Sequence, residues 1–349
     1  MNHSLPRMAY IADGNLQHVF PIEAMLRVLP APVFTNGERL AQRLRCQAEV
    51  VIASPQELPA IIASRDIDIL FSTSQVLSPP LLRRARPSLK VVFLGHGESD
   101  KTEPRPFQEQ YDEFDLLAIA RQDFYHTLAN PHKELVGSLK HDLFLARGYD
   151  RQQPEPAHVL WAPGWGRHNA VSSRLQEVVD ATHALGLTCL LHLHPYSYEA
   201  EPHVVRLAQV EVLRHRHFRL VQTGDILKVM SRCALMLGDV SSVCYDWLLF
   251  DRPILFLNHP GLSLAEEKHL FAAGRVVGDG DSLCEALREE LSNPAAQQSV
   301  RRAALARCFL ALDGQAAQRV VDAIMRRWWD NWVWGSSTHG PGSISRGGG

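Results

Sequence analysis

The sequence lacks the long apolar segments, paired cysteines and charge excess that identify several classes of protein. No run approaches the roughly 18 apolar residues needed to span a bilayer, and the first apolar run, residues 8–12, is too short for the core of a signal peptide. The 36 basic and 38 acidic residues give no electrostatic reason to expect nucleic acid as a partner. The six cysteines include no CxxC pair, which is typical of buried thiols in a reducing compartment. We therefore expect a cytoplasmic protein.

Common catalytic and nucleotide-binding signatures are also missing. The sequence has no GxSxG, HExxH, Walker or GxGxxG motif, which argues against a serine hydrolase, a zinc protease, a P-loop NTPase and a dinucleotide-dependent enzyme. Asp279-Gly280-Asp281 has the form of a metal-binding DxD motif, but a turn followed by a helix cap explains it better. The HxH pair at His192 and His194 has no carboxylate or cysteine cluster to complete a zinc site. We expect no metal and no cofactor.

Short apolar runs alternate with helical stretches along most of the chain. The predicted strands lie at residues 8–12, 32–35, 49–53, 68–72, 90–94 and 116–120 in the first half, and at 159–162, 188–193, 218–221, 234–238 and 253–258 in the second. Continuous apolar strands that alternate with helices indicate parallel sheets built from βαβ units. The pattern lapses at residues 148–157, where two prolines and several charges indicate a linker.

This organisation predicts an α/β protein with two Rossmann-like lobes, the layout of glycosyltransferases known as GT-B. In such folds ligands bind where loops leave the carboxyl ends of the strands, which here is the cleft between the lobes. We expect residues 1–150 to form the N-terminal lobe and residues 151–334 the C-terminal lobe with its terminal helices. Residues 335–349 are rich in glycine and serine and are expected to be disordered. The main alternative is two Rossmann-like domains of a dehydrogenase or an epimerase.

The most informative segment joins a buried strand to a helix that opens on two serines. Gly238 and Asp239 end the strand, and Ser241 and Ser242 follow where a helix start has unpaired N–H groups and a partial positive charge. With two added hydroxyls, this start is a candidate phosphate cradle. Asp246 lies one turn beyond Ser242 and is expected to reach a ribose or another hydroxyl. A plain helix cap by Ser241 is the structural alternative.

Two histidines alternate with leucines near the end of another predicted strand. His192 and His194 therefore share a face of that strand. His194 stands at its carboxyl end, just before a proline, where an imidazole can donate hydrogen bonds to a diphosphate or protonate its leaving oxygen. His192 is one pleat further back and is expected to be structural.

A third candidate is the loop after the predicted strand at residues 90–94. Gly95 and Gly97 flank His96, and glycines let a ligand approach the main chain closely. His96 is placed to act as a general base towards an acceptor hydroxyl. Three charged residues follow in the same loop as orienting or phosphate-binding groups: Glu98, Asp100 and Lys101. A surface loop with an incidental histidine is the alternative.

Arginine and tryptophan side chains mark three further segments. Arg167 lies in a Gly/Pro/Trp loop at residues 161–169, where it can neutralise a donor phosphate or a charge on the acceptor. The alternative is that this segment is an ordinary connecting loop. The basic run at residues 214–219 is expected to be a solvated helix end. Residues 326–334 place four tryptophans beside two arginines, which suits either a membrane–water interface or a terminal helix that docks on the first lobe.

These segments, in this order, resemble the CDP-glycerol glycerophosphotransferase family, which includes the teichoic-acid polymerases and their relatives in capsule assembly. The matching pieces lie within about residues 90–325 and are Gly95-His96-Gly97 with Asp100-Lys101, Ala162-Pro163 with Trp165 and Arg167, His194-Pro195, Asp239-Val240-Ser241-Ser242 with Asp246, Arg252-Pro253-Ile254, and Leu312-Asp313-Gly314 with Arg319-Val320. Each piece is short, and their shared order carries the match.

The resemblance implies roles for the candidate residues. The first lobe would hold the acceptor, with His96 as its base, and the second lobe would hold the donor diphosphate through His194, Ser241 and Ser242. The other implied donor-site residues are Asp239, Asp246, Arg167, Gly95, Gly97 and Lys101. The family needs no obligatory cofactor, uses a CDP-linked donor and a saccharide or lipid-linked polymer acceptor, and often makes peripheral contact with the inner face of the plasma membrane.

The expected function is transfer of glycerol phosphate, or a related polyol phosphate, from a CDP-activated donor to a hydroxyl of a cell-surface polymer precursor. One alternative is a GT-B glycosyltransferase that uses a nucleotide sugar in capsule or lipopolysaccharide synthesis. Another is a non-catalytic scaffold that binds a nucleotide.

Overall fold

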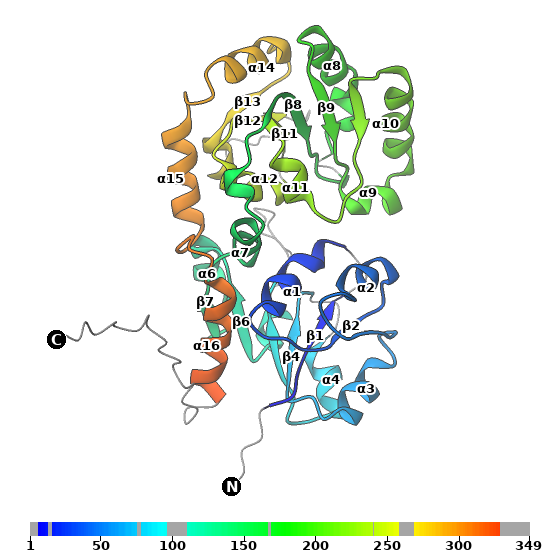
Figure 1. Cartoon of the computed structure of the whole chain (residues 1–349), viewed down its shortest axis with the longest axis vertical. Coiled ribbons are helices and arrows are strands. Elements are labelled where there is room, and N and C mark those ends of the chain that lie inside the picture. Colours follow the sequence, from blue (N-terminus) through cyan, green and yellow to red (C-terminus); the bar gives the residue numbers. More distant parts are fainter. Residues whose placement is uncertain are drawn as a thin grey trace, which may run out of the picture.

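The structure is a computed structural model that describes residues 6–12, 16–74, 78–95, 110–166, 169–239, 241–257 and 269–328, with only the backbone at Gln17 and Asp123. Two parallel sheets form the centres of two lobes stacked along the long axis of the molecule (Figure 1). The expected α/β architecture is therefore confirmed. In the parts of the chain described, no helix is long and apolar enough to cross a bilayer.

The first lobe contains a seven-stranded sheet in the order β3-β2-β1-β4-β5-β6-β7. Its strands are β1 (Met8–Ala12), β2 (Val33–Thr35), β3 (Val50–Ile52), β4 (Ile69–Ser72), β5 (Lys90–Phe93), β6 (Leu116–Ile119) and β7 (Lys133–Leu135). Its helices are α1 (Val19–Leu26), α2 (Glu38–Leu44), α3 (Leu58–Ser64), α4 (Pro79–Ala85), α6 (Gln122–Thr127) and α7 (Leu139–Ala146), with 3-10 turns η1 (Leu16–His18) and η2 (Tyr111–Glu113).

The second lobe contains a six-stranded sheet in the order β10-β9-β8-β11-β12-β13. Its strands are β8 (Glu155–Trp161), β9 (Thr188–Leu191), β10 (Phe218–Leu220), β11 (Cys233–Gly238), β12 (Ile254–Leu257) and β13 (Arg275–Val277). Its helices are α8 (Val171–Ala184), α9 (Pro195–Ala200), α10 (Pro202–Arg214), α11 (Ile226–Met230), α12 (Val243–Trp247), α14 (Leu283–Ser292) and α15 (Gln298–Cys308), with 3-10 turns η3 (Tyr149–Arg151), η5 (Leu248–Phe250) and η6 (His269–Ala273).

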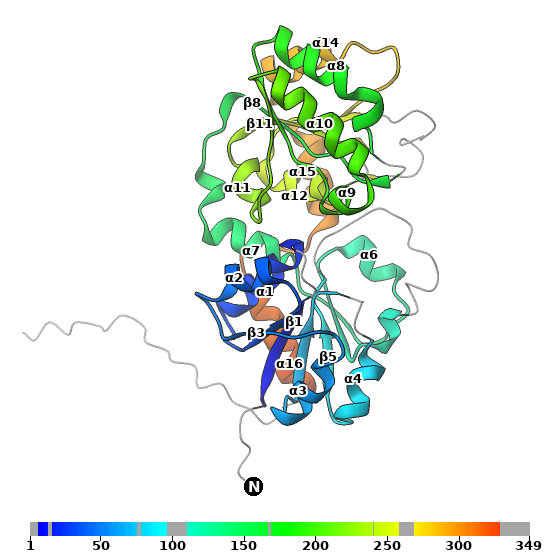
Figure 2. The ribbon, with the colours of Figure 1, turned by 90° about the vertical axis from the view of Figure 1, so that its right-hand side faces the viewer.

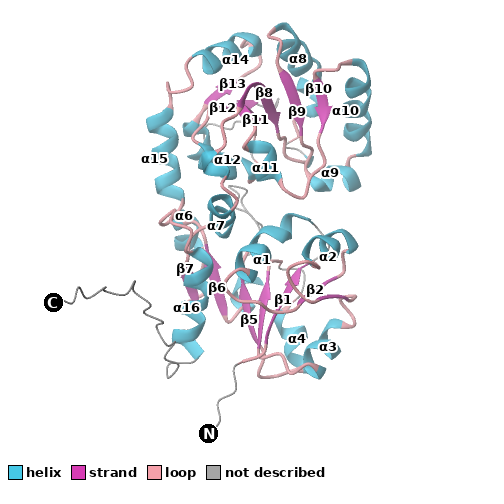
Figure 3. Ribbon diagram, in the orientation of Figure 1, coloured by secondary structure: helices cyan, strands magenta, loops and turns pink. Residues whose placement is uncertain are grey.

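Both sheets are covered by helices on their two faces (Figure 3). Alternate residues of the central strands enter different cores, as the period of two along a strand requires. In β1, Tyr10 joins the core formed with α1 and α7, whereas Ile11 joins the core formed with α3 and α4. The central strands are thus buried on both faces, which is why they form continuous apolar runs in the sequence.

One hydrophobic core extends across the two lobes. It includes Phe20 of α1, Phe144 of α7, Trp247 of α12 and Ile324 near the carboxyl end of the chain. The rings of Phe144 and Phe250 meet edge to face with their centroids 4.9 Å apart. Burial of apolar area on this scale holds the lobes together beyond what a single linker provides.

The last helix, α16 (Ala316–Trp328), returns from the second lobe and packs along the first (Figures 1 and 2). The carboxylate of Asp142 in α7 accepts hydrogen bonds from the backbone N–H groups of Ala316 (3.1 Å) and Ala317 (2.7 Å) at its start. Trp328 packs against the shared core. Although α16 falls within residues 151–334 of the sequence, which we assigned to the second lobe, it covers the first.

The stretch at residues 148–157, which the composition predicts to be a linker, contains ordered structure. Gly148 adopts a left-handed conformation (φ +67°) before η3, and β8 already begins at Glu155. Prolines are compatible with the first residues of a strand, where an N–H is not needed for the ladder. Glu155 also bonds to Arg232, both through its N–H to the carbonyl oxygen (2.9 Å) and through its carboxylate, which fixes the start of the strand.

Candidate functional site

The loops after β8, β9 and β11 lie at one edge of the second sheet, because these three strands are neighbours and run parallel. Asp239, directly after β11, is almost fully buried and accepts a hydrogen bond from the N–H of Gly164 in the loop after β8 (2.6 Å). This charge-assisted bond ties two of the three loops together.

The loop after β8 is also held from its other side. The carboxylate of Glu201 accepts hydrogen bonds from the N–H of Gly166 (3.2 Å), from Asn169 Nδ2 (3.1 Å) and from Ser197 Oγ of α9 (2.7 Å). Glu201 is 9% exposed, so these bonds satisfy a carboxylate that is largely removed from water. The side chain of Trp165 therefore projects from a loop fixed at both ends.

His194 does not lie within the strand, because β9 ends at Leu191. It is the N-cap of α9, and its Nδ1 accepts a hydrogen bond from the N–H of Tyr196 (3.2 Å). A ring whose Nδ1 accepts carries its proton on Nε2 when neutral, so Nε2 is a donor. The ring stacks near Tyr196 (centroids 5.8 Å apart) and Trp165 (6.0 Å), which themselves are 38% and 37% exposed.

His192 has a different environment. One of its ring nitrogens, Nδ1, lies 3.1 Å from the carbonyl oxygen of Val221, and burial lowers the pKa of the imidazole. A carbonyl oxygen can only accept, so Nδ1 donates this bond. The bond connects the ends of the neighbouring strands β9 and β10.

The two serines lie at the start of α12, directly beyond the Asp239 loop. Ser242 is the N-cap residue but makes no side-chain capping bond, and Ser241 is 6% exposed. Helix α12 approaches β11 so closely that a Cβ at Gly238 would be 2.5 Å from the Sγ atom of Cys244. With Cys244 in this place, a side chain at position 238 would force the helix away from the strand.

Asp246 lies at the contact between the lobes. The residue is 5% exposed, and its carboxylate forms an ion pair with Lys140 of α7, with 2.7 Å between Oδ2 and Nζ. Burial raises the pKa of Asp246, and the neighbouring lysine opposes that rise. The residue expected to reach a ribose hydroxyl is thus already engaged by a lysine that the sequence pattern does not single out.

A small pocket opens beside this ion pair, lined by both Lys140 and Asp246. The rest of its lining comes from Pro21 of α1, the start of α7 and the carboxyl edge of the first sheet. That edge includes Gly95 after β5 and Gly137 after β7, both with positive φ (+68° and +93°). Gly95 therefore lies where the sequence predicts. The other loop residues of the prediction, His96, Gly97 and Lys101, lie outside the described residues, as does Arg167 of the second lobe.

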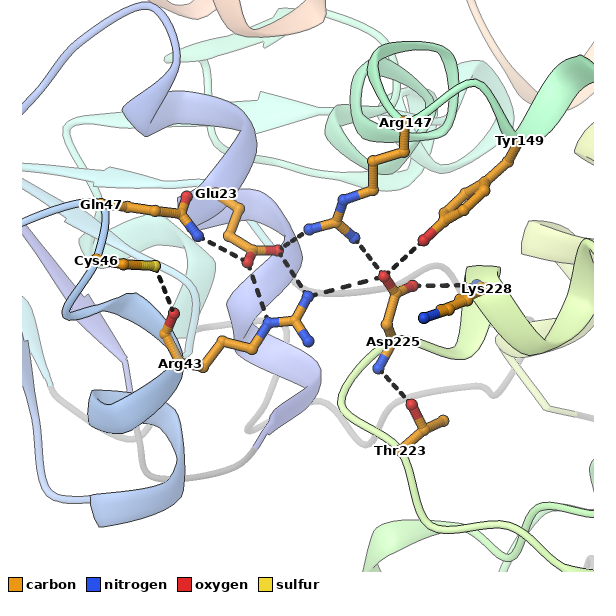
Figure 4. Close-up of polar contacts among 9 residues, drawn as sticks. All are labelled: Glu23, Arg43, Cys46, Gln47, Arg147, Tyr149, Thr223, Asp225 and Lys228. Atoms are coloured by element: carbon orange, nitrogen blue, oxygen red, sulfur yellow. Dashed lines mark hydrogen bonds and ion pairs between the residues drawn. The ribbon is translucent and has the colours of Figure 1, made fainter.

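A second polar contact between the lobes lies at the other end of α7 (Figure 4). Arg147, the C-cap of α7, bonds to Glu23 of α1 (2.5 Å) and to Asp225 at the start of α11 (2.8 Å). Arg43 of α2 bonds to Glu23 (3.1 Å) and lies 3.7 Å from Asp225. The hydroxyl of Tyr149 donates to Asp225 (2.8 Å), and burial together with this bond raises its pKa to about 12.

Neither Lys140 nor this group of charges has a signal in the sequence that identifies it as part of a site. Lys140 and Asp246 are 106 positions apart, and no short motif contains both. The local signal that was available is Ser138 after Gly137, since Ser138 caps α7 by accepting from the N–H of His141.

In the parts of the chain described, no group of three or more His, Cys, Asp or Glu side chains could hold a metal ion. The two acids of the DxD motif are turn residues. The carboxylate of Asp281 accepts from the N–H of Gly278 (2.8 Å), and the helix cap itself is Ser282 rather than the expected Asp281.

Comparison with solved structures finds the same two-lobe architecture in other proteins. The wall teichoic acid polymerase TagF is 13% identical, with 92% of this chain and 89% of that chain covered and a TM-score of 0.64. A putative UDP-N-acetylglucosamine 2-epimerase from Listeria monocytogenes is 12% identical over 94% and 98% of the chains (TM-score 0.64), and MurG from Acinetobacter baumannii is 13% identical over 92% and 100% (TM-score 0.53). At these identities the likeness shows the fold alone.

The chain was also compared with protein sequences and with sequence models of protein families, which test more than the fold. No individual curated protein sequence matches the chain significantly. The model of the CDP-glycerol:poly(glycerophosphate) glycerophosphotransferase family matches residues 121–326, more than half of the chain. The match includes α7 with Lys140, the loops around Asp239 and His194, and the serines at α12. The chain belongs to the CDP-glycerol:poly(glycerophosphate) glycerophosphotransferase family.

Proposed function

We propose that this protein transfers glycerol phosphate, or a related polyol phosphate, from a CDP-activated donor to a hydroxyl of a cell-surface polymer precursor. The family description supports this donor and this kind of polymer. Among the structural neighbours, TagF was solved after a soak with CDPG, and HepE from Anabaena was solved with UDP. In our proposal the first lobe, residues 1–150, receives the acceptor and the second, from residue 151, holds the donor.

The observation that carries the proposal is the hydrogen bond from Gly164 to Asp239. It fixes the loop that contains Trp165 against the loop that leads to Ser241, and Trp165 in turn contacts His194. A site of this kind is preorganised, so its donors need not be reordered as charge develops on a diphosphate. Three short segments far apart in the sequence thus supply one anion site.

The donor groups would come from Ser241, Ser242 and the Nε2–H of His194. These are hydroxyl, backbone N–H and imidazole donors, which suit phosphate oxygens. Arg167, from the same loop as Trp165, would add a positive charge.

In the transfer step His96 would take the proton of the acceptor hydroxyl. The acceptor oxygen would then form a bond to the β-phosphorus of the donor as the bond from that phosphorus to the bridging oxygen breaks and CMP leaves. Charge that develops on the bridging oxygen would be stabilised by His194 and the serine-bearing start of α12. Gly95 and Gly97 would let the acceptor approach the main chain beside His96, and Lys101 would meet a phosphate.

Asp246 would have a role that depends on Lys140. While the two are paired, the carboxylate is buried and cannot accept from a ribose hydroxyl. A donor that brings its phosphates near Lys140 would share the lysine and leave Asp246 an acceptor for the ribose. Both residues line the pocket between the lobes, which supports this exchange.

The experiment that tests the function is incubation of the purified protein with CDP-glycerol, CMP-sugars or UDP-sugars and a hydroxyl acceptor, with the released nucleotide identified by chromatography. CMP released from CDP-glycerol, in step with phosphodiester formation, supports the proposal. Release of UDP or CMP from a nucleotide sugar with formation of a glycosidic bond would make the protein a glycosyltransferase. Calorimetric binding of nucleotide without turnover of any donor would make it a scaffold.

A further inference from the structure

Helix α12 is short and lies at the side of the second lobe that faces the first (Figures 1 and 2). It has five residues, and isolated helices of fewer than about 12 residues are only marginally stable in water. Contacts with the rest of the protein must therefore hold it in place. Because Ser241 and Ser242 directly precede the helix, the same contacts determine where the two serines lie.

Three consecutive residues of α12 make these contacts. Successive side chains of an α-helix point about 100° apart, so three in a row reach most of the way around it. Cys244 packs on the end of β11 in its own sheet. Asp246 pairs with Lys140 of the first lobe. Between the two, Tyr245 is 1% exposed and lies against Arg121, which also belongs to the first lobe.

The contact between Arg121 and Tyr245 is a cation–π interaction. The Cζ atom of Arg121 lies 4.2 Å from the centroid of the Tyr245 ring, well within the distance of about 6 Å over which such pairs attract. Arg121 is 4% exposed, and removal of the guanidinium from water strengthens its attraction to the ring. The ring of Tyr245 thus helps to compensate a buried charge, and the two lobes are held together at this point.

The backbone at Arg121 is constrained from several sides. Arg121 follows β6 closely and is the N-cap residue of α6, where its carbonyl oxygen accepts a hydrogen bond from the N–H of Tyr125 (3.0 Å). It also pairs in an antiparallel bridge with Phe309, in the segment that leads from α15 to α16. A guanidinium on a backbone held in this way can fix the position of a short helix that packs against it.

We infer that Arg121 is a positioning residue for the donor site. Through the ring of Tyr245 it holds α12 in place, and with α12 it holds Ser241 and Ser242. The inference rests on the proposed function for the role of the two serines. Because Arg121 belongs to the first lobe and the serines to the second, the serines are held in their place only while the lobes are packed together.

Hydrogen exchange tests the positioning without any nucleotide. Arg121→Met retains most of the side-chain length and removes the charge, so the backbone amides of residues 241–247 should exchange about tenfold faster, as expected for loss of a buried cation–π contact. Tyr245→Leu should have the same effect and provides the same test if Arg121→Met does not fold. The matched control is Arg65→Met, which removes another arginine of the first lobe from the ring of Phe34 (5.8 Å) and should leave this exchange unchanged.

Calorimetric titration with CDP tests the consequence for the donor. The Kd for CDP should rise about tenfold in Arg121→Met and in Tyr245→Leu. Arg121→Lys retains a cation and Tyr245→Phe retains the ring, so each should lose less affinity than the corresponding larger change. The double variant Arg121→Met/Tyr245→Leu should bind no more weakly than either single variant, because both changes remove one contact. Circular dichroism melts check that the variants are folded.

The inference is overturned if exchange at residues 241–247 is the same in Arg121→Met, Tyr245→Leu and the unmodified chain. It is also overturned if exchange becomes faster and CDP still binds as tightly as before. Additive losses of affinity in the double variant would show that the two residues act separately, which contradicts it as well. If the unmodified protein binds no CDP, the proposed function fails, and the exchange measurement still decides whether Arg121 holds α12.

Discussion

Lys140 of α7 and Asp246 of α12 form an ion pair across the two lobes, with 2.7 Å between Nζ and Oδ2. Both side chains are largely buried, at 13% and 7% exposure. The same short helix contacts the start of α16 through Asp142 and the start of α11 through Arg147. Helix α7 therefore makes polar contacts with the second lobe at both of its ends and is the last α-helix before the second sheet.

Removal of Lys140 should leave the carboxylate of Asp246 buried without its partner. We predict that Lys140→Met lowers the free energy of unfolding by about 3–5 kcal/mol at neutral pH. The double variant Lys140→Met/Asp246→Asn should recover most of that loss. Urea unfolding measures both. Equal losses in the single and double variants would contradict the idea that the unpaired carboxylate of Asp246 causes the loss.

The same substitution should alter the dependence of stability on pH. In Lys140→Met only burial acts on Asp246, so its folded-state pKa lies above the unfolded value. The folded state then binds more protons between those two values, and stability falls as the pH rises through that range. We predict that Lys140→Met is least impaired at acidic pH. A deficit that is the same at every pH would contradict this.

His141 gives a pH dependence of the opposite sign. Burial lowers the pKa of its imidazole to about 4. Between the ordinary value of about 6.5 and 4, the unfolded chain binds the proton and the folded chain does not, so stability is lost as the pH falls through this window. His141→Phe, which retains a ring beside Phe144, should lose this part of the dependence. Thermal melts across the window measure it, with the exposed His126→Phe as control.

The two proposed catalytic histidines should be needed for turnover and not for folding. We predict that His194→Ala and His96→Ala each reduce kcat at least about 10²-fold, the usual cost of losing one preorganised donor or base. His126→Ala, an exposed histidine on α6, is the matched control. Near-normal turnover in both variants would refute the assignment, and unchanged melting temperatures would show that folding is intact.

Substitution of Gly238 tests whether stability and donor affinity depend on the position of α12. A Cβ at this residue would lie 2.5 Å from Cys244 Sγ, so Gly238→Ala should displace α12 and cost about 1–3 kcal/mol of stability. Donor affinity should fall with it, because Ser241 and Ser242 move. The double variant Gly238→Ala/Cys244→Ala removes the clashing sulfur and should restore both. Denaturant unfolding and calorimetric titration with CDP provide the two readouts.

Much of the fold is predictable from the sequence because most strands are buried on both faces. Runs such as those of β1, β4 and β11 have no polar interruption and alternate with helices, so the two-lobe α/β prediction is confirmed. The edge strands β7 (Lys133–Leu135) and β13 (Arg275–Val277) are only three residues long, and both contain charged residues. A search for apolar runs therefore misses them. Helix α7 was missed as well, although Ser138 marks its start.

Candidate site residues are predictable where a single segment contains the signal. The strand-to-helix turn at Gly238 and Ser242 and the loop of His194 fall at the expected edge of the sheet. Contacts between segments are not predictable in this way. The bonds of Asp239 to Gly164, of Glu201 to Gly166 and of Lys140 to Asp246 depend on the packing of distant elements, which no local pattern encodes.

The most direct test of the account is a crystal structure of the protein with CDP bound. The α- and β-phosphates should lie within hydrogen-bond distance of both His194 Nε2 and the hydroxyl or backbone N–H groups of Ser241 and Ser242. A diphosphate bound away from either the histidine or the serine-bearing start of α12 would contradict the account.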